Sequence, residues 1–147
     1  MKRGSICAEA RVGKAETEGV LLKLRASNPD LVVQMVSVGE LPSAKAVRMI
    51  SEQTLRAMEN GDMLASKPEV DLLLRLAGTR QIAVAMERCG YKGPGKKLLV
   101  ALGPEGPLEA LRRKLAGDKS FDLLEGDEVD EKGLRMVEDA ALLASRN

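Results

Sequence analysis

The chain has 147 residues, of which 44% are hydrophobic and 31% charged, and its formal net charge is +1. This length and composition predict one globular domain with one sizeable core, and the near-zero charge gives no global attraction to nucleic acid. The absence of His excludes Ser-His-Asp triads, His general bases and His-ligated metals, while one Tyr, one Phe and no Trp leave almost no platform for base stacking.

The two cysteines, Cys7 and Cys89, lie far apart in the sequence, and we predict that each is a buried free thiol, with a disulfide between them as the alternative. The basic start of the chain is not followed by the apolar segment of a signal peptide. No apolar run approaches the length that spans a membrane. We therefore expect a cytoplasmic protein that does not contact a membrane.

The first part of the chain alternates predicted strands and helices. Weak alternation predicts a strand over residues 5–12, and an apolar stripe predicts a helix over 15–27. The run of β-branched residues at 31–38 is the clearest strand signal, and an amphipathic helix follows at about 44–59.

The second part begins with two more helices, at 67–77 and about 80–89, so that three helices follow one another without a strand. This order excludes a simple repeated βαβ fold. The remaining predicted elements are strands at 97–102 and 121–125, helices at 107–116 and 130–137, and an apolar segment at 140–145 that must dock to be ordered. The mixture indicates an α+β fold.

The helix at 67–77 is apolar on nearly all sides, which is typical of a buried helix. Ser66 and Glu69 have the spacing of a capping box, and Pro68 suits the first helical turn because its missing N–H costs little there. Gly78 is placed to end the helix. We expect this helix at the centre of the core.

Two further features belong to the turn that follows this helix. Asp71 and Arg75 are placed for an i,i+4 ion pair, and Thr79 is placed to cap the next helix. Arg80 and Gln81 lie at the corner beside that helix, where free N–H groups and a cation could bind an anion. The alternative is a core helical hairpin whose corner is only structural, and the two interpretations are compatible.

The loop from Gly90 to Lys97 nearly matches a phosphate-binding P-loop. Gly90, Gly95 and Lys96 have the P-loop spacing, but Lys97 stands where Ser or Thr should hold Mg²⁺. The loop also follows a helix and opens a strand, which is the reverse of a P-loop. We favour a plain basic connection, with contact between Lys92, Lys96 and Lys97 and a phosphate backbone as a smaller possibility.

The run LLLRLAGTRQI at residues 72–82, followed by Ala85 and Gly90, resembles the kinase-binding subunit of the KEOPS complex, which is called the PRPK-binding protein family in eukaryotes. The order of elements on both sides fits as well, so the resemblance covers essentially all of residues 1–147 as one domain. The short chain without long insertions is similar to the archaeal form.

The resemblance implies a fold, a role and a set of contact residues. The implied fold is a small, mainly antiparallel sheet of three to four strands covered by about six to seven helices. The implied role is a non-catalytic subunit, without cofactor, metal or small-molecule substrate, that binds and activates the atypical kinase of KEOPS. It also helps recruit tRNA through its 3′ CCA end for threonylcarbamoyl-adenosine modification. The implied tRNA contacts are Arg75, Arg80 and Gln81, with Lys67 as a weaker candidate, and the implied core or kinase-facing residues are Leu72, Ile82 and Met86.

A second class of function stays open beside this one. The loop 90–97 could belong to a small nucleotide-binding enzyme, although no residue pattern assembles a nucleophile with a base or a metal cluster. We therefore expect a binding subunit rather than an enzyme.

Overall fold

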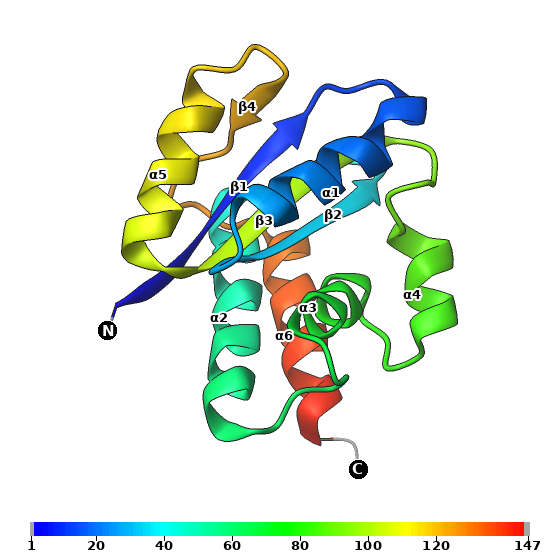
Figure 1. Ribbon diagram of the computed structural model, residues 1–147. Helices are drawn as coiled ribbons and strands as arrows, with labels where there is room; N and C mark the ends of the chain where they lie inside the picture. The colour runs from blue at the N-terminus through cyan, green and yellow to red at the C-terminus, as the bar shows by residue number, and fades with distance from the viewer. Residues whose placement is uncertain (1, 146–147) are drawn as a thin grey trace.

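The computed structural model describes residues 2–145, and its centre is a four-stranded antiparallel sheet (Figure 1). The strands are β1 (Arg3–Ala10), β2 (Val32–Val38), β3 (Lys96–Pro104) and β4 (Phe121–Leu123). Their order in the sheet is β2-β3-β1-β4. In the central pairs, Ala101 of β3 lies opposite Ile6 of β1 and Val33 of β2.

Six α-helices accompany the sheet in the described part of the chain. They are α1 (Thr17–Ser27), α2 (Ala44–Asn60), α3 (Pro68–Ala77), α4 (Ile82–Cys89), α5 (Glu105–Ala116) and α6 (Glu131–Ser145), and a short 3₁₀ turn, η1 (Lys14–Glu16), precedes α1. This arrangement confirms the predicted α+β fold with a small antiparallel sheet covered by helices.

Both faces of the sheet are covered (Figure 1). Helices α1 and α5 pack on one face, and α2, α3 and α6 pack on the other, where α4 lies beside α3 and β2. Strand β3 shows the consequence, because Leu98, Val100 and Leu102 enter the α2–α3–α6 layer while Leu99 and Ala101 enter the α1–α5 layer. All five side chains are at most 1% exposed, as the continuous apolar run predicts.

The C-terminal part differs from the sequence-based expectation. Residues 130–137 and 140–145 do not form a short helix and a separate docking segment, because α6 runs without a break from Glu131 to Ser145. Val137, Ala140 and Leu143 are buried at intervals of three residues, so one stripe docks the whole helix. The other boundaries agree within two residues, which is the usual uncertainty of helix and strand ends.

Candidate functional site

The candidate functional site comprises the corner between α3 and α4 and the outward face of α4. Helix α3 forms its buried base. Pro68 occupies its first turn, and Gly78 ends it with a left-handed backbone (φ 70°) that lets its N–H reach the carbonyl oxygens of Leu74 and Arg75. The predicted Ser66 capping box is not formed, since Lys67 occupies the N-cap position and makes no side-chain cap. Leu72 is fully buried, so of its two predicted roles the structure supports the core one.

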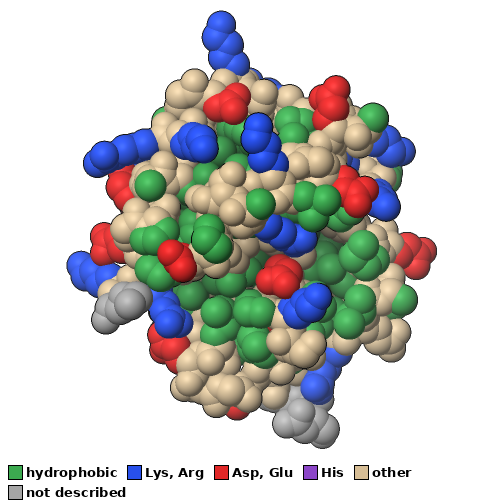
Figure 2. Space-filling model, viewed as in Figure 1, with side chains coloured by type: hydrophobic (Ala, Val, Ile, Leu, Met, Phe, Trp, Pro, Cys, Tyr) green, Lys and Arg blue, Asp and Glu red, His purple; other side chains and the backbone are tan. Residues whose placement is uncertain are grey.

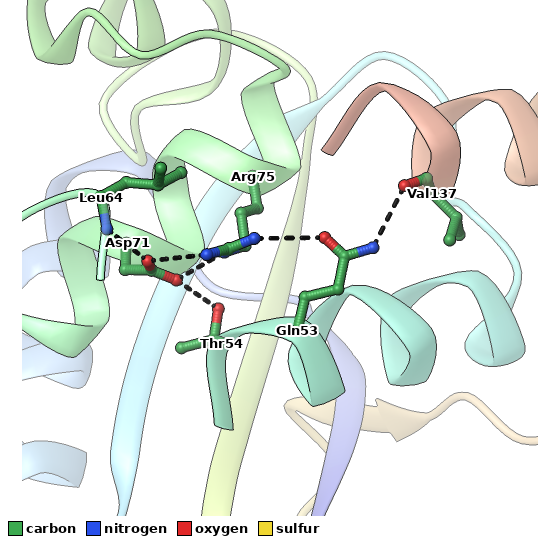
Figure 3. A network of polar contacts seen from close by, with 6 residues as sticks. All are labelled: Gln53, Thr54, Leu64, Asp71, Arg75 and Val137. Carbon is green, nitrogen blue, oxygen red and sulfur yellow. Dashed lines mark hydrogen bonds and ion pairs between the residues drawn. The ribbon is translucent and has the colours of Figure 1, made fainter. Parts of the chain in front are cut away.

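A buried polar network fixes α3 to its neighbours (Figure 3). Arg75 donates from Nε to Oδ1 of Asp71 at 2.8 Å and from Nη2 to Oδ2 at 3.3 Å. The Asp71 carboxylate also accepts from the Thr54 hydroxyl at 2.7 Å and from the Leu64 backbone N–H at 2.9 Å. The network therefore joins α2, α3 and the segment between them.

Gln53 extends this network to α6. Its side-chain oxygen accepts from Nη1 of Arg75 at 3.4 Å, and its amide donates to the Val137 carbonyl at 3.1 Å (Figure 3). The i,i+4 pair of Asp71 and Arg75 is thus confirmed, and its two side chains are 0% and 4% exposed. The guanidinium of Arg75, the third of the expected tRNA contacts, is engaged by Asp71 and Gln53, so a contact with tRNA would require it to leave these partners.

The corner between α3 and α4 carries two of the predicted tRNA contacts on its surface. The Thr79 hydroxyl accepts from the Gln81 backbone N–H at 3.2 Å, and α4 begins one residue later, at Ile82. Arg80 therefore lies in the bend before the helix rather than in its first turn, and both Arg80 and Gln81 are exposed. Thr79 caps the turn and not the helix itself.

Helix α4 has an inward face and an outward apolar face. Ala85 and Cys89 are buried against the core, whereas Ile82 and Met86, one turn apart, are 52% and 44% exposed. Figure 2 shows hydrophobic side chains gathered around α3 and towards α4, with charged side chains scattered among them. The apolar residues of α4 are therefore divided between core and surface.

Two pockets flank the C-terminal end of α3. One, of about 390 Å³, lies between the segment 37–43, the ends of α3 and α4, and the start of α6, and its lining includes Arg88 and Cys89. The other, of about 330 Å³, lies between the end of α3 and α6, and Gly78 and Arg135 are on its wall. Arg88 donates to the Ala77 carbonyl at 3.2 Å and so connects α4 to the end of α3.

The loop 90–97 connects α4 to β3, so its order is indeed the reverse of a P-loop. The three lysines expected to cluster in it do not all meet, because Lys96 and Lys97 line one pocket and Lys92 is not in its lining. Lys92 pairs with Glu18 on α1 at 3.9 Å, and Lys96 is exposed. Lys97 is buried and donates to the Ser37 hydroxyl at 3.1 Å and to the Gly93 carbonyl. No local sequence pattern predicts that Lys14 lines a pocket with Lys97, because only the folded chain brings these distant residues together.

No protein-family model matches the chain, and no curated protein matches it significantly.

In the described part of the chain, no three His, Cys, Asp or Glu side chains are grouped so that they could hold a metal ion. Within residues 2–145, no helix combines the length and the apolar character that crossing a membrane needs.

Proposed function

We propose that the chain is a non-catalytic accessory subunit of a KEOPS-type complex that binds and activates the kinase subunit and helps recruit tRNA. The observation that carries the proposal is the exposed apolar pair Ile82 and Met86 on α4. This helix directly follows the motif at 72–82 that resembles the family. The antiparallel sheet covered by helices, which the resemblance also implies, supports the proposal further.

The outward face of α4 is the proposed kinase-binding surface. Ile82 and Met86 are spaced so that both could enter one apolar groove of a partner, and Met adapts its shape to such a groove. Leu72 is left out of this surface because it is fully buried. Burial of two exposed apolar side chains favours association, since water is removed from both surfaces.

The corner before α4 is the proposed contact for the 3′ end of tRNA. Arg80 supplies a cation and Gln81 an amide that can read an unpaired base edge. Lys67 is exposed at the opposite end of α3, about 15 Å away for a helix of this length. We therefore assign the Lys67 contact to a part of the tRNA other than its CCA end.

Mixing experiments with the purified kinase subunit and with tRNA test this function. We expect the chain to co-elute with the kinase and to raise its ATP turnover. We also expect tRNA binding that weakens when the 3′ CCA is removed and when salt is raised. The change Arg80→Ala should remove the CCA-dependent part while the melting temperature stays close to that of the wild type. Failure to bind the kinase, or CCA-dependent binding that persists in Arg80→Ala, would contradict the respective part of the proposal.

The alternative, a nucleotide-binding enzyme using the loop 90–97, predicts ATP turnover by the chain alone. Our proposal predicts none, because Lys97 stands where a P-loop has its hydroxyl and is engaged by Ser37 and Gly93. Turnover by the isolated chain that disappears on Lys96→Ala would favour the enzyme.

A further inference from the structure

A pocket of about 310 Å³ lies on the α1–α5 side of the sheet, where the loop 90–97 meets the segment before α1. Its lining includes Lys14 of η1, Lys97 at the start of β3, and residues 93–95 of the loop. These parts lie far apart in the sequence and are joined by the pairing of β1 and β2 with β3.

Lys97 is a buried cation whose neighbours among the described residues supply no counter-charge. The residue is 7% exposed, and its ammonium donates to the Ser37 hydroxyl and the Gly93 carbonyl, which are both neutral. An ammonium has three N–H donors, so one remains for another acceptor. Within residues 2–145, no carboxylate forms an ion pair with Lys97.

A second cation, Lys14, faces the same pocket. The burial of Lys97 lowers the pKa of its ammonium, and the positive charge of Lys14 lowers that pKa further. Glu9 also lines the pocket, but its carboxylate pairs with Arg11 at 3.6 Å, and the nearby Lys92 pairs with Glu18. A bound anion would therefore offset both the desolvation of Lys97 and its repulsion by Lys14.

The glycine-rich turn that borders the pocket is held in place. Gly95 has a φ of 104°, and a Cβ at this position would collide with the Val38 carbonyl oxygen, so only glycine fits between the turn and β2. The Ser37 hydroxyl also donates to the carbonyl oxygens of Gly93 and Pro94. The pocket is thus formed before any ligand enters, which lowers the entropic cost of binding.

We propose that this pocket binds a phosphate group, with the ammonium groups of Lys97 and Lys14 as its cationic ligands. Lysine binds phosphate as a compact charge without the planar geometry that carboxylate recognition by arginine uses. The phosphate can come from a small molecule or from an RNA backbone. The site needs neither the kinase surface nor the corner at Arg80, so it is independent of the function proposed above.

Backbone NMR of the full chain tests the site with two probes at constant ionic strength, inorganic pyrophosphate and tRNA lacking its 3′ CCA. We expect saturable shifts of the amide signals of residues 93–97 and of Lys14 with at least one probe. Pyrophosphate alone would indicate a small phosphate ligand, and tRNA alone would indicate the RNA backbone. Absence of saturable shifts with both probes overturns the proposal.

Variants separate this site from general charge effects. Lys14→Gln removes an exposed ammonium and should weaken binding of the effective probe about tenfold without disturbing the fold. Lys97→Met removes the buried ammonium and should abolish the shifts. Lys92 lies in the same loop, but its ammonium pairs with Glu18 rather than facing the pocket. The control variant Lys92→Gln should therefore bind the probe as the wild type does. Arg80→Ala should leave these shifts unchanged, and equal binding by wild type, Lys14→Gln and Lys97→Met overturns the proposal.

Discussion

Asp71 and Arg75 place two opposite charges inside the layer formed by α2, α3 and α6. In this buried position each charge is stabilised by the other. Moving a charge from water into a protein interior is costly, and the pair offsets this cost only while its hydrogen bonds are complete. Thr54 and Leu64 satisfy the remaining lone pairs of the carboxylate, and Gln53 contacts the guanidinium. The pair therefore stabilises the packing of α3 against α2 and α6.

The change Arg75→Ala should lower the free energy of unfolding by about 3–5 kcal/mol, because it leaves the buried Asp71 carboxylate without its counter-charge. Urea unfolding of the wild type and the variant measures this difference in the free energy of unfolding. The matched control is Arg56→Ala, which removes the exposed i,i+4 pair with Glu52 and should cost about 0.3–0.5 kcal/mol. Similar losses for the two variants would contradict the structural role of the buried pair.

The two cysteines give a pH dependence with a defined sign. Burial raises the pKa of the Cys7 and Cys89 thiols from 9.0 to about 11, so the folded chain keeps thiol protons that the unfolded chain releases. Their contribution to stability is complete below pH 9 and is lost as pH rises towards 11.

Chemical unfolding between pH 8 and pH 11 measures this effect. We expect the wild type to lose more stability over this range than the double variant Cys7→Ala, Cys89→Ala. The comparison isolates the thiols, because the lowered pKa of Lys97 raises stability with pH in both proteins. Parallel pH profiles would show that the thiols ionise equally in the folded and unfolded chains.

At the scale of elements, local signals predicted most helices and strands, and long-range contacts decided the rest. Pro68, Gly78 and the apolar run between them define α3 from sequence alone. The Ser66 cap failed because the helix begins one residue later than the capping box requires, with Lys67 at the N-cap position. The strand order and the meeting of Lys14 with Lys97 depend on sheet pairing, which no local pattern encodes.

Helix α3 is the element on which the helical layer depends. Leu73 and Leu76 are 4% and 8% exposed, so Leu73→Ala or Leu76→Ala should cost about 2–5 kcal/mol of unfolding free energy through lost burial and a cavity. Leu22→Ala on α1 is the control, because this side chain is 55% exposed and its removal should cost little. Thermal and urea unfolding provide the measurement, and losses below about 1 kcal/mol at both α3 positions would mean that the helix is not part of the core.

At the scale of the whole molecule, one side of the sheet combines the buried network with the surfaces proposed for binding. Helices α2, α3 and α6 form a fixed layer, and α4 presents its apolar pair from the edge of that layer. The corner at Arg80 lies between α3 and α4, so a kinase on α4 and a tRNA end at the corner would be neighbours. The phosphate pocket lies beyond the other end of α4, on the opposite face of the sheet.

The affinity of the purified kinase subunit for charge variants of α4, measured by calorimetry, tests the central claim most directly. Ile82→Glu and Met86→Glu should each weaken kinase binding more than tenfold, because a carboxylate would be buried in an apolar interface. Both should keep the wild-type melting temperature, since these side chains are exposed. Leu22→Glu, on the far side of the sheet, should bind as the wild type does. Folded α4 variants that bind the kinase with wild-type affinity, or a wild type that does not bind it, would contradict the account.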